Sequence, residues 1–329
     1  PVKPPAPEVK LAEFKPIQKH SAYSSALEAL GEMIESFGDG ETAVMVETIQ
    51  DKTASGGKLP NDVTLLTESA LQNVGEKLIV FPYSENSLQN AAAQGLPLYG
   101  VRGAITEFDA ETTSVSSGSQ TGLFLKDVDA STDDSDDFSS GTIAMDFLIM
   151  DYSRGFYVPG VKATAKAKIE KASKNQGYSF SIVGNGFGVT GSTSCQTPVH
   201  DVINKMIEYS MVQLIGKLKE YPYWLAISGA DPDYRQIKKM GKKYNRYDLE
   251  SKHRLVSYII SLTDSGVAPH QTSFDSYTRS KVAQLKHKFN LPAGSSNVSK
   301  EFYLKLLNEA LLLINQQQVI GQTDQMLDA

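Results

Sequence analysis

Residues 161–189 carry the pattern that most restricts the fold, because their side chains alternate in polarity over the length of a strand. The first part of the segment alternates four apolar and four polar residues: Ala163, Ala165, Ala167 and Ile169 against Thr164, Lys166, Lys168 and Glu170. A period of two is typical of a β-strand with one buried face. A turn is expected at 175–177, and Tyr178, Phe180 and Ile182 begin a return strand. The segment therefore predicts a β-hairpin.

A long helix is expected next, over residues 197–221, with Pro198 near its start. Its apolar residues recur at the spacing of one helix face: Val202, Ile203, Met206, Ile207, Met211 and Leu214. Earlier in the chain, expected helices alternate with expected strands. The helices are placed at 19–37, 63–75 and 84–95, and the strands at 43–50, 77–83, 99–109 and 141–155. This order predicts an α+β fold, a mixed sheet with packed helices and protruding β-hairpins.

The helix expected at 63–75 has four apolar residues that we expect to face the sheet: Leu65, Leu66, Ala70 and Leu71. After Tyr223 and Trp224 the chain becomes polar and lysine-rich, and a small all-α module follows. We therefore divide the chain into an extended N-terminal tether at 1–16, a ring-forming domain at 17–225, a basic linker at 226–252 and a helical domain at 253–329.

Composition excludes several classes of protein. The net charge of −6 argues against a nucleic-acid partner, and no run of about 18 apolar residues predicts a transmembrane helix. The lone cysteine, Cys195, allows no intrachain disulfide. The proline-rich start, PVKPPAPEVKLAEFKP, is typical of a processed lipoprotein tether or of a trimmed chain.

A search for reactive groups gives no catalytic arrangement. The five histidines show no metal-ligand spacing, so no metal or other cofactor is expected. The acidic run at 127–137 has Thr132 and Phe138 where a calcium loop needs Gly and Glu. The stretch NGFGVTGS lacks the lysine of a phosphate-binding loop. We expect a structural or transport protein, not an enzyme.

Residues 41–224 resemble the curli-secretion-channel (CsgG-like) family of outer-membrane lipoproteins. The resemblance rests on five stretches in order: AVMVETIQDKTASGGKLPNDVTLLTESAL, YGVRGAITEFDAET, MDFLIMDYSRG, the hairpin VKATAKAKIEK–KNQGYSFSIV, and the helix TPVHDVINKMIEYSMVQLIGKL with the following YPYW. The resemblance implies a periplasmic ring of identical subunits, attached to the outer membrane, whose paired hairpins form a barrel. It also implies that a loop after the first strand lines the narrowest point of the channel.

In this sequence the corresponding loop is DKTASGGKLPND, at 51–62. The candidate constriction residues are Thr53, Ser55, Lys58, Pro60 and Asn61. Small polar residues, two glycines and a stiffening proline suit a narrow polar opening. The absence of an aromatic residue predicts a wider or less selective opening, and an ordinary surface loop is the alternative.

The hairpin regions depart from the family, because they fit a lipid-facing surface poorly. The first strand of the 161–189 hairpin presents mainly alanine on one side and lysine on the other, and the 112–147 region is more polar still and carries the acidic run. Two arrangements stay open: a ring without a complete membrane barrel, and a barrel that carries a large acidic loop.

The C-terminal stretch SFDSYTRSKVAQLKHKFNLPAGSSNVSKEFYLKLL resembles the peptidoglycan-binding-like three-helix domain. The resemblance implies a cell-wall or partner-binding role for Asp275, Thr278, Lys286 and Phe289. The family usually has Phe-Gln where this chain has Leu285–Lys286, and the apolar positions equally fit a plain helical core.

Two functions follow. The first is a secretion channel that exports a polypeptide across the outer membrane. The second is a structural ring or scaffold of an envelope machine, such as a flagellum or pilus, anchored to peptidoglycan. In both cases the expected partner is a second copy of this chain, together with the exported polypeptide or other subunits of the machine.

Overall fold

The computed structural model describes residues 22–38, 40–112, 138–171, 178–184, 187–193, 198–227, 230–264, 271–292 and 297–327. The expected tether at 1–16, the acidic run at 127–137, the hairpin turn at 175–177 and Cys195 lie outside these residues.

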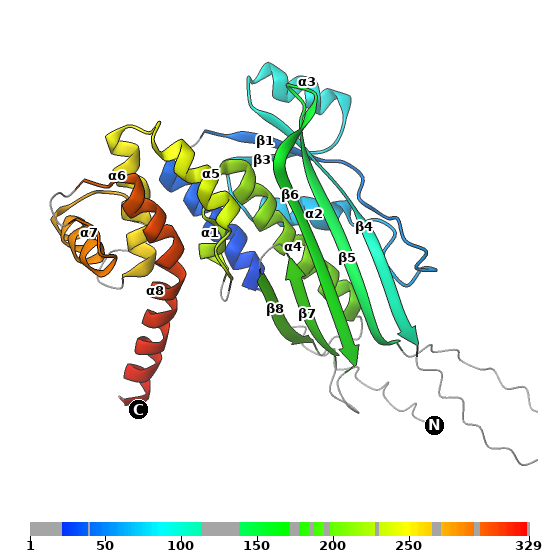
Figure 1. Cartoon of the computed structure of the whole chain (residues 1–329). Helices are drawn as coiled ribbons and strands as arrows, with labels where there is room; N and C mark the ends of the chain where they lie inside the picture. Colours follow the sequence, from blue (N-terminus) through cyan, green and yellow to red (C-terminus); the bar gives the residue numbers. More distant parts are fainter. Residues whose placement is uncertain are drawn as a thin grey trace, which may run out of the picture.

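The architecture is α+β, as the sequence predicts, and is built on one mixed sheet (Figure 1). The strands lie in the order β3 (Leu78–Phe81), β1 (Thr42–Val46), β4 (Leu98–Thr112), β5 (Phe138–Asp151), β6 (Phe156–Lys171), β7 (Tyr178–Gly184) and β8 (Phe187–Thr193). A short strand, β2 (Gln50–Asp51), also pairs with β4. The strands β1, β2, β3 and β4 pair in parallel, and those from β4 to β8 pair antiparallel.

The parallel end of the sheet is covered on both faces. Helices α1 (Ala22–Phe37) and α2 (Thr64–Gln72) share one hydrophobic core with α4 (Pro198–Lys219) on one face. Helix α3 (Glu85–Ala93) covers the other face through Ala91, against Ala43, Met45 and Leu98. All five residues of β1 are buried, as expected for a strand between two helical layers.

The antiparallel end has one covered face and one open face. The alanines of β6 and Ile169 are fully buried in the core that α4 completes, and the intervening lysines are exposed. The predicted alternation is therefore confirmed, and its alanine face packs on a helix. Small side chains here let α4 pack directly on β6, in one core with its alanines.

One expectation about α2 is wrong. Leu65 is 75% exposed and Leu66 is 37% exposed, whereas Ala70 and Leu71 are buried as expected. The buried stripe instead runs through Val63, Thr67, Ala70 and Leu71, at spacings of four, three and one. Leu65 and Leu66 precede Thr67 of this stripe by one to two residues, which turns them about 100–200° away from it.

The segment expected to be a basic linker contains a helix. Helix α5 (Tyr234–Tyr244) begins at the cap Asp233, whose carboxylate accepts hydrogen bonds from the backbone N–H groups of Arg235 and Gln236. Its buried apolar residues recur about one helical turn apart: Ile237, Met240, Gly241 and Tyr244. Gln236 is buried beside them, Lys238 and Lys242 are exposed, and Lys239 and Lys243 are half-buried. Because lysines alternate with these apolar residues, the segment looks polar in the sequence, and the apolar stripe did not predict a helix there.

Helices α6 (Leu249–Thr263), α7 (Ser276–Lys288) and α8 (Lys300–Leu327) make up the C-terminal helical module, and α6 begins inside the range expected as a linker. The module packs on the rest of the chain. The ring of Phe37 lies edge-on to those of Tyr221 and Tyr258, with centroids 4.8 and 5.1 Å away. The carboxylate of Glu220 pairs with Lys239 and Lys243 of α5. A continuous hydrophobic core therefore joins the sheet to the helices.

Candidate functional site

The loop between β2 and α2 is organised by one carboxylate. Asp51 Oδ1 accepts hydrogen bonds from the backbone N–H of Thr53 at 2.8 Å and from its hydroxyl at 2.6 Å. Asp51 Oδ2 accepts one from the Ser55 hydroxyl at 2.6 Å. Desolvation favours a higher pKa for Asp51, but the hydrogen bonds from Ser55 and Thr53 outweigh it and lower the pKa below its usual 3.8.

The two ends of the loop are held together by the backbone. The N–H of Asp51 donates to the carbonyl of Asn61 at 3.1 Å, and the N–H of Lys52 donates to the carbonyl of Ile105 on β4 at 3.0 Å. Leu59, a residue of the loop itself, is buried in the hydrophobic core. Gly56 and Gly57 have φ of 63° and 84°, in the left-handed region that favours glycine. The loop is thus preorganised, and residues 54–58 form its tip.

The five constriction candidates fall into three groups. Ser55 is only 6% exposed, because its hydroxyl turns into the loop toward Asp51. Thr53 and Pro60 are half-buried, and Lys58 and Asn61 are exposed. The solvent-facing surface also includes Ala54, Gly56 and Gly57, which the sequence analysis did not select. A constriction role for this loop stays a prediction, with Ala54 in place of Ser55 as the residue to probe.

The loop lies at one edge of the sheet. β2 pairs with β4 only at Ala104 and Ile105. Beyond that point, among the residues that the structure describes, β4 pairs only with β5. At the opposite edge, the described part of the chain gives β8 one partner, β7. The end strands of the sheet are β3 and β8, and β4 adds an unpaired stretch beyond the point where β1 and β2 leave it. The sequence showed the strands but not these free edges.

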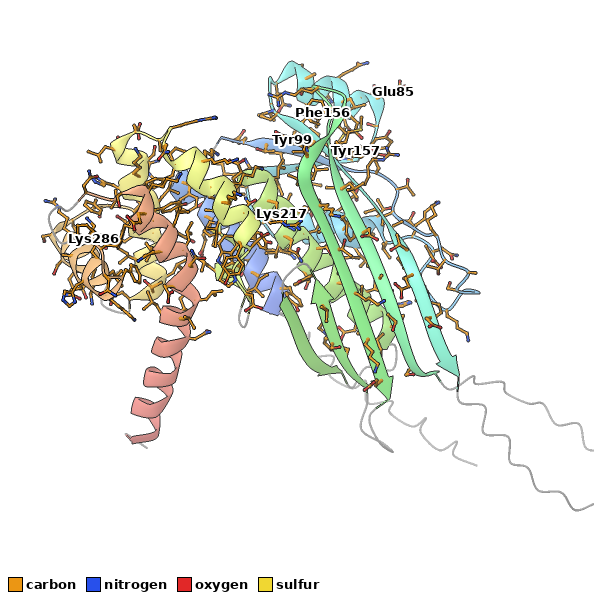
Figure 2. The ribbon with its side chains drawn as sticks, in the orientation of Figure 1. Glu85, Tyr99, Phe156, Tyr157, Lys217 and Lys286 are labelled. Atoms are coloured by element: carbon orange, nitrogen blue, oxygen red, sulfur yellow. The ribbon has the colours of Figure 1, made fainter. Side chains whose placement is uncertain are left out.

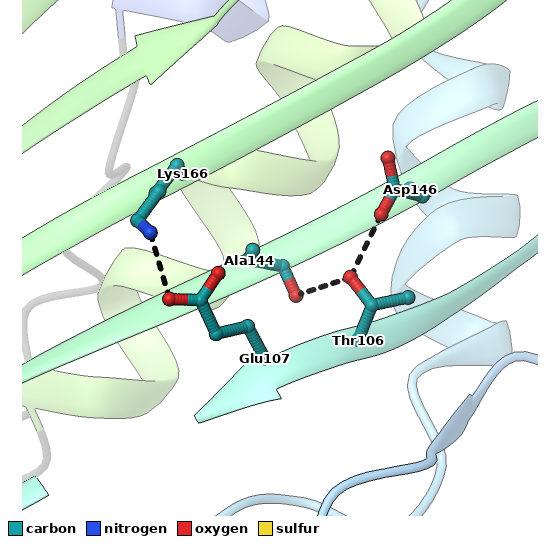
Figure 3. A network of polar contacts seen from close by, with 5 residues as sticks. All are labelled: Thr106, Glu107, Ala144, Asp146 and Lys166. Atoms are coloured by element: carbon teal, nitrogen blue, oxygen red, sulfur yellow. Dashed lines mark hydrogen bonds and ion pairs between the residues drawn. The ribbon is translucent and has the colours of Figure 1, made fainter. Parts of the chain in front are cut away.

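The open face of the antiparallel strands carries a polar network (Figure 3). The Thr106 hydroxyl donates to Asp146 Oδ2 at 2.8 Å. The Thr164 hydroxyl donates to the other carboxylate oxygen at 2.6 Å. Lys166 pairs with Glu107 at 2.7 Å. A register shift in β4 between Ile105 and Glu107 places two successive polar side chains on this face. The face therefore carries one ion pair and one hydrogen-bonded carboxylate across three strands, and it suits contact with water.

A second polar group lies where β4, β5 and β6 meet the parallel strands. Arg102 Nε is 2.7 Å from Glu47, which also accepts a hydrogen bond from the Tyr152 hydroxyl at 2.8 Å. Arg102 Nη1 donates to the Tyr157 hydroxyl at 2.5 Å. Phe156 and Tyr157 are 46% and 45% exposed and lie near Tyr99 (Figure 2). No spacing in the sequence pointed to this group, since its members come from four separate segments.

The four candidates in the helical module all serve its internal structure. Asp275 caps α7 by accepting a hydrogen bond from the Thr278 N–H at 2.7 Å. Thr278 is fully buried, Lys286 is 4% exposed and Phe289 is 8% exposed. Lys286 Nζ donates to the carbonyl of Asn297 at 2.7 Å. A cell-wall or partner-binding role for these residues stays a prediction.

Within the described ranges, no group of three or more His, Cys, Asp or Glu side chains is placed to hold a metal ion. In the same ranges, no helix has both the length and the apolar character needed to cross a bilayer.

No family model matches this chain, and no curated protein matches it. Among solved structures, it is similar to a PelC dodecamer from Paraburkholderia phytofirmans. The TM-score is 0.26 and the sequence identity is 15%, covering 53% of this chain and 88% of that chain. A TM-score of this size does not establish a shared fold.

Proposed function

We propose that this chain is a subunit of a closed homo-oligomeric ring in the bacterial periplasm, attached to the outer membrane, and that the ring is a secretion channel. The observation that carries the proposal concerns the long antiparallel strands: among the residues that the structure describes, β4 from Thr106 to Thr112 and β8 each have one unpaired edge. Exposed strand edges present unpaired backbone donors and acceptors, which pair readily with another chain.

The two edges are suited to each other. Four antiparallel pairings separate β4 from β8, so the two strands run in the same direction. The β8 edge of one copy would add to the β4 edge of the next as a parallel pair, the type already present between β1 and β4. Such a contact uses two different surfaces of each subunit, and repeating it gives a ring when the rotation closes.

The preorganised loop supports a channel. Its first strand, β2, pairs with β4 directly beside the unpaired stretch of β4. In the ring, one loop tip would therefore lie next to each contact between neighbouring subunits. The exposed tip residues Ala54, Gly56 and Gly57 are small, and Lys58 and Asn61 are polar. A ring of such tips makes a narrow, hydrated opening that offers no reactive group to a passing polypeptide. In this proposal the chain has no enzymatic activity.

A structural ring or scaffold of an envelope machine is the second candidate. The observation that favours it is the packing of α6–α8 against the sheet domain at the side away from the loop (Figure 1). A module fixed there would lie on the outside of the ring and could bind peptidoglycan or another subunit of the machine. The loops would then face the axis of the ring.

Size-exclusion chromatography of the full chain with light scattering tests the ring, and a monomer at micromolar concentration would exclude it. The channel is tested by single-channel conductance in lipid bilayers. A Cys195→Ser, Ala54→Cys protein should lose most of its conductance on labelling with a bulky thiol reagent.

The matched control is Cys195→Ser, Leu65→Cys, since Leu65 is exposed on α2 outside the loop. Labelling there should leave conductance unchanged. A ring that forms but does not conduct, or whose conductance ignores the label at position 54, would favour the scaffold.

A further inference from the structure

A cavity of about 630 Å³ lies where three distant segments of the chain meet. Its walls come from the start of β6, the end of α4 and the first turns of α5. Four cationic side chains and one carboxylate line it: Lys162, Lys217, Arg235, Lys239 and Asp233. Gly160, in the left-handed region with φ of 76°, adds no side chain to the wall.

Lys217 is the buried cation of this cavity (Figure 2). Its side chain comes from the last turn of α4, and the residue is 6% exposed. Nζ donates to the carbonyl oxygen of Lys162 at 2.9 Å and to Gln213 Oε1 at 3.2 Å. Both acceptors are neutral, so they satisfy two of the three Nζ donors without balancing the charge, and Nζ also lies 5.8 Å from the centre of the Tyr223 ring.

The nearby carboxylates already have other partners. Asp233 Oδ2 accepts a hydrogen bond from the Tyr223 hydroxyl at 2.7 Å, and Oδ1 accepts two from the first turn of α5. Glu220 pairs with Lys239 and Lys243. Desolvation lowers the pKa of Lys217, and Lys162 and Arg235 lower it further, against an opposing effect of Asp233. The cavity therefore has more positive than negative charge.

The wall of the cavity also contains an unpaired polar group. Gln236 lines the cavity and is only 5% exposed. Its Nε2 has no hydrogen-bond partner among the residues that the structure describes. A buried amide donor is costly to leave unpaired, so such a group usually has a partner in the working protein.

We propose that this cavity binds a phosphate-type oxyanion. Arg235 is exposed beside it, and its planar guanidinium suits two-point contact with a phosphate. Lys217 and Lys162 supply further positive charge. The same chemistry is present in a soluble phosphate ester and in a phospholipid headgroup. The inference does not depend on the ring or on a channel.

Isothermal titration of the full chain with pyrophosphate tests the site. We expect saturable binding that Arg235→Gln weakens by about tenfold or more, the scale of one charged hydrogen bond. Lys217→Met should weaken it at least as much, provided that its circular dichroism matches that of the unmodified protein.

The matched control is Lys238→Gln, which removes one charge from an exposed position of the same helix outside the cavity. Binding should be unchanged. Equal losses in Arg235→Gln and Lys238→Gln would show a diffuse basic surface, and absence of saturable binding at millimolar pyrophosphate would also overturn the proposal.

Sedimentation with phosphatidylglycerol vesicles distinguishes the two sources of phosphate in a protein that binds pyrophosphate. Vesicle binding that pyrophosphate displaces, and that Arg235→Gln loses but Lys238→Gln keeps, would support a headgroup in the cavity. Pyrophosphate binding without vesicle binding would support a soluble phosphate ester.

Discussion

For both the loop at 51–62 and the helical module, we chose candidate residues by resemblance to a family. In the structure, the two sets of residues differ in their exposure and in the contacts they make. In the loop, Asp51 and Ser55 make the internal contacts and leave the tip exposed to solvent. In the module, Thr278, Lys286 and Phe289 are themselves the buried residues. A family pattern can thus mark a displayed surface in one region and a core in another. Mutations separate the two cases.

The largest effect is expected from Phe289→Ala. Because Phe289 is 8% exposed and lies near Phe302, the change should lower the free energy of unfolding by about 3 kcal/mol. Urea denaturation measures it. Phe156→Ala, at an exposed aromatic, should cost less than about 1 kcal/mol. If Phe289→Ala lowers the free energy of unfolding only slightly, Phe289 is not needed for the core and becomes a candidate for surface binding again.

Asp51→Asn should have the next largest effect, at about 1 kcal/mol near neutral pH, because it weakens the charged acceptor of the loop. The pKa of Asp51 is lowered by folding, so the stability that its charge supplies is complete above the usual 3.8 and declines as pH falls through the folded-state pKa. The difference in unfolding free energy between the two proteins should therefore shrink below about pH 4. A difference independent of pH would mean that the charge does not hold the loop.

Thr278→Val should leave stability unchanged or raise it by about 0.5 kcal/mol. The Thr278 hydroxyl is buried and has no hydrogen-bond partner in the described part of the chain, so a methyl group of similar shape fits its place. Thermal unfolding followed by circular dichroism measures the change. The variant should also sediment with purified sacculi as well as the unmodified protein does. A loss of sedimentation without a loss of stability would assign Thr278 to binding.

The smallest effect is expected on the open face. Glu107→Gln and Lys166→Gln, combined in a double-mutant cycle, should give a coupling energy of about 0.5 kcal/mol that falls in high salt. Both side chains are about half exposed, so water screens the pair. A coupling that persists in roughly 1 M salt would indicate that another surface covers this face in solution.

Much of the fold was readable from the sequence, because the period of two in β6 and the apolar stripe of α4 are local patterns. Helix α5 was missed because its stripe is short and interrupted by lysines. The exposure of Leu65 depends on where α2 begins. The burial of Ser55 depends on its hydrogen bond with Asp51. Local sequence patterns define neither. The cavity between β6, α4 and α5 is lined by Lys162, Lys217 and Arg235, which come from three separate segments of the chain. Only the folded structure therefore shows it.

The alanine face of β6 has a mechanical consequence. Alanine has no adjustable side-chain torsion, so the surface that Ala163, Ala165 and Ala167 present to α4 has a fixed shape. The helix supplies longer and more flexible buried side chains, among them Met206 and Met211. When a neighbouring molecule pulls on the strands, the sheet should therefore act as the stiff member of the pair. The rotamers of α4 should act as the compliant layer that absorbs the load.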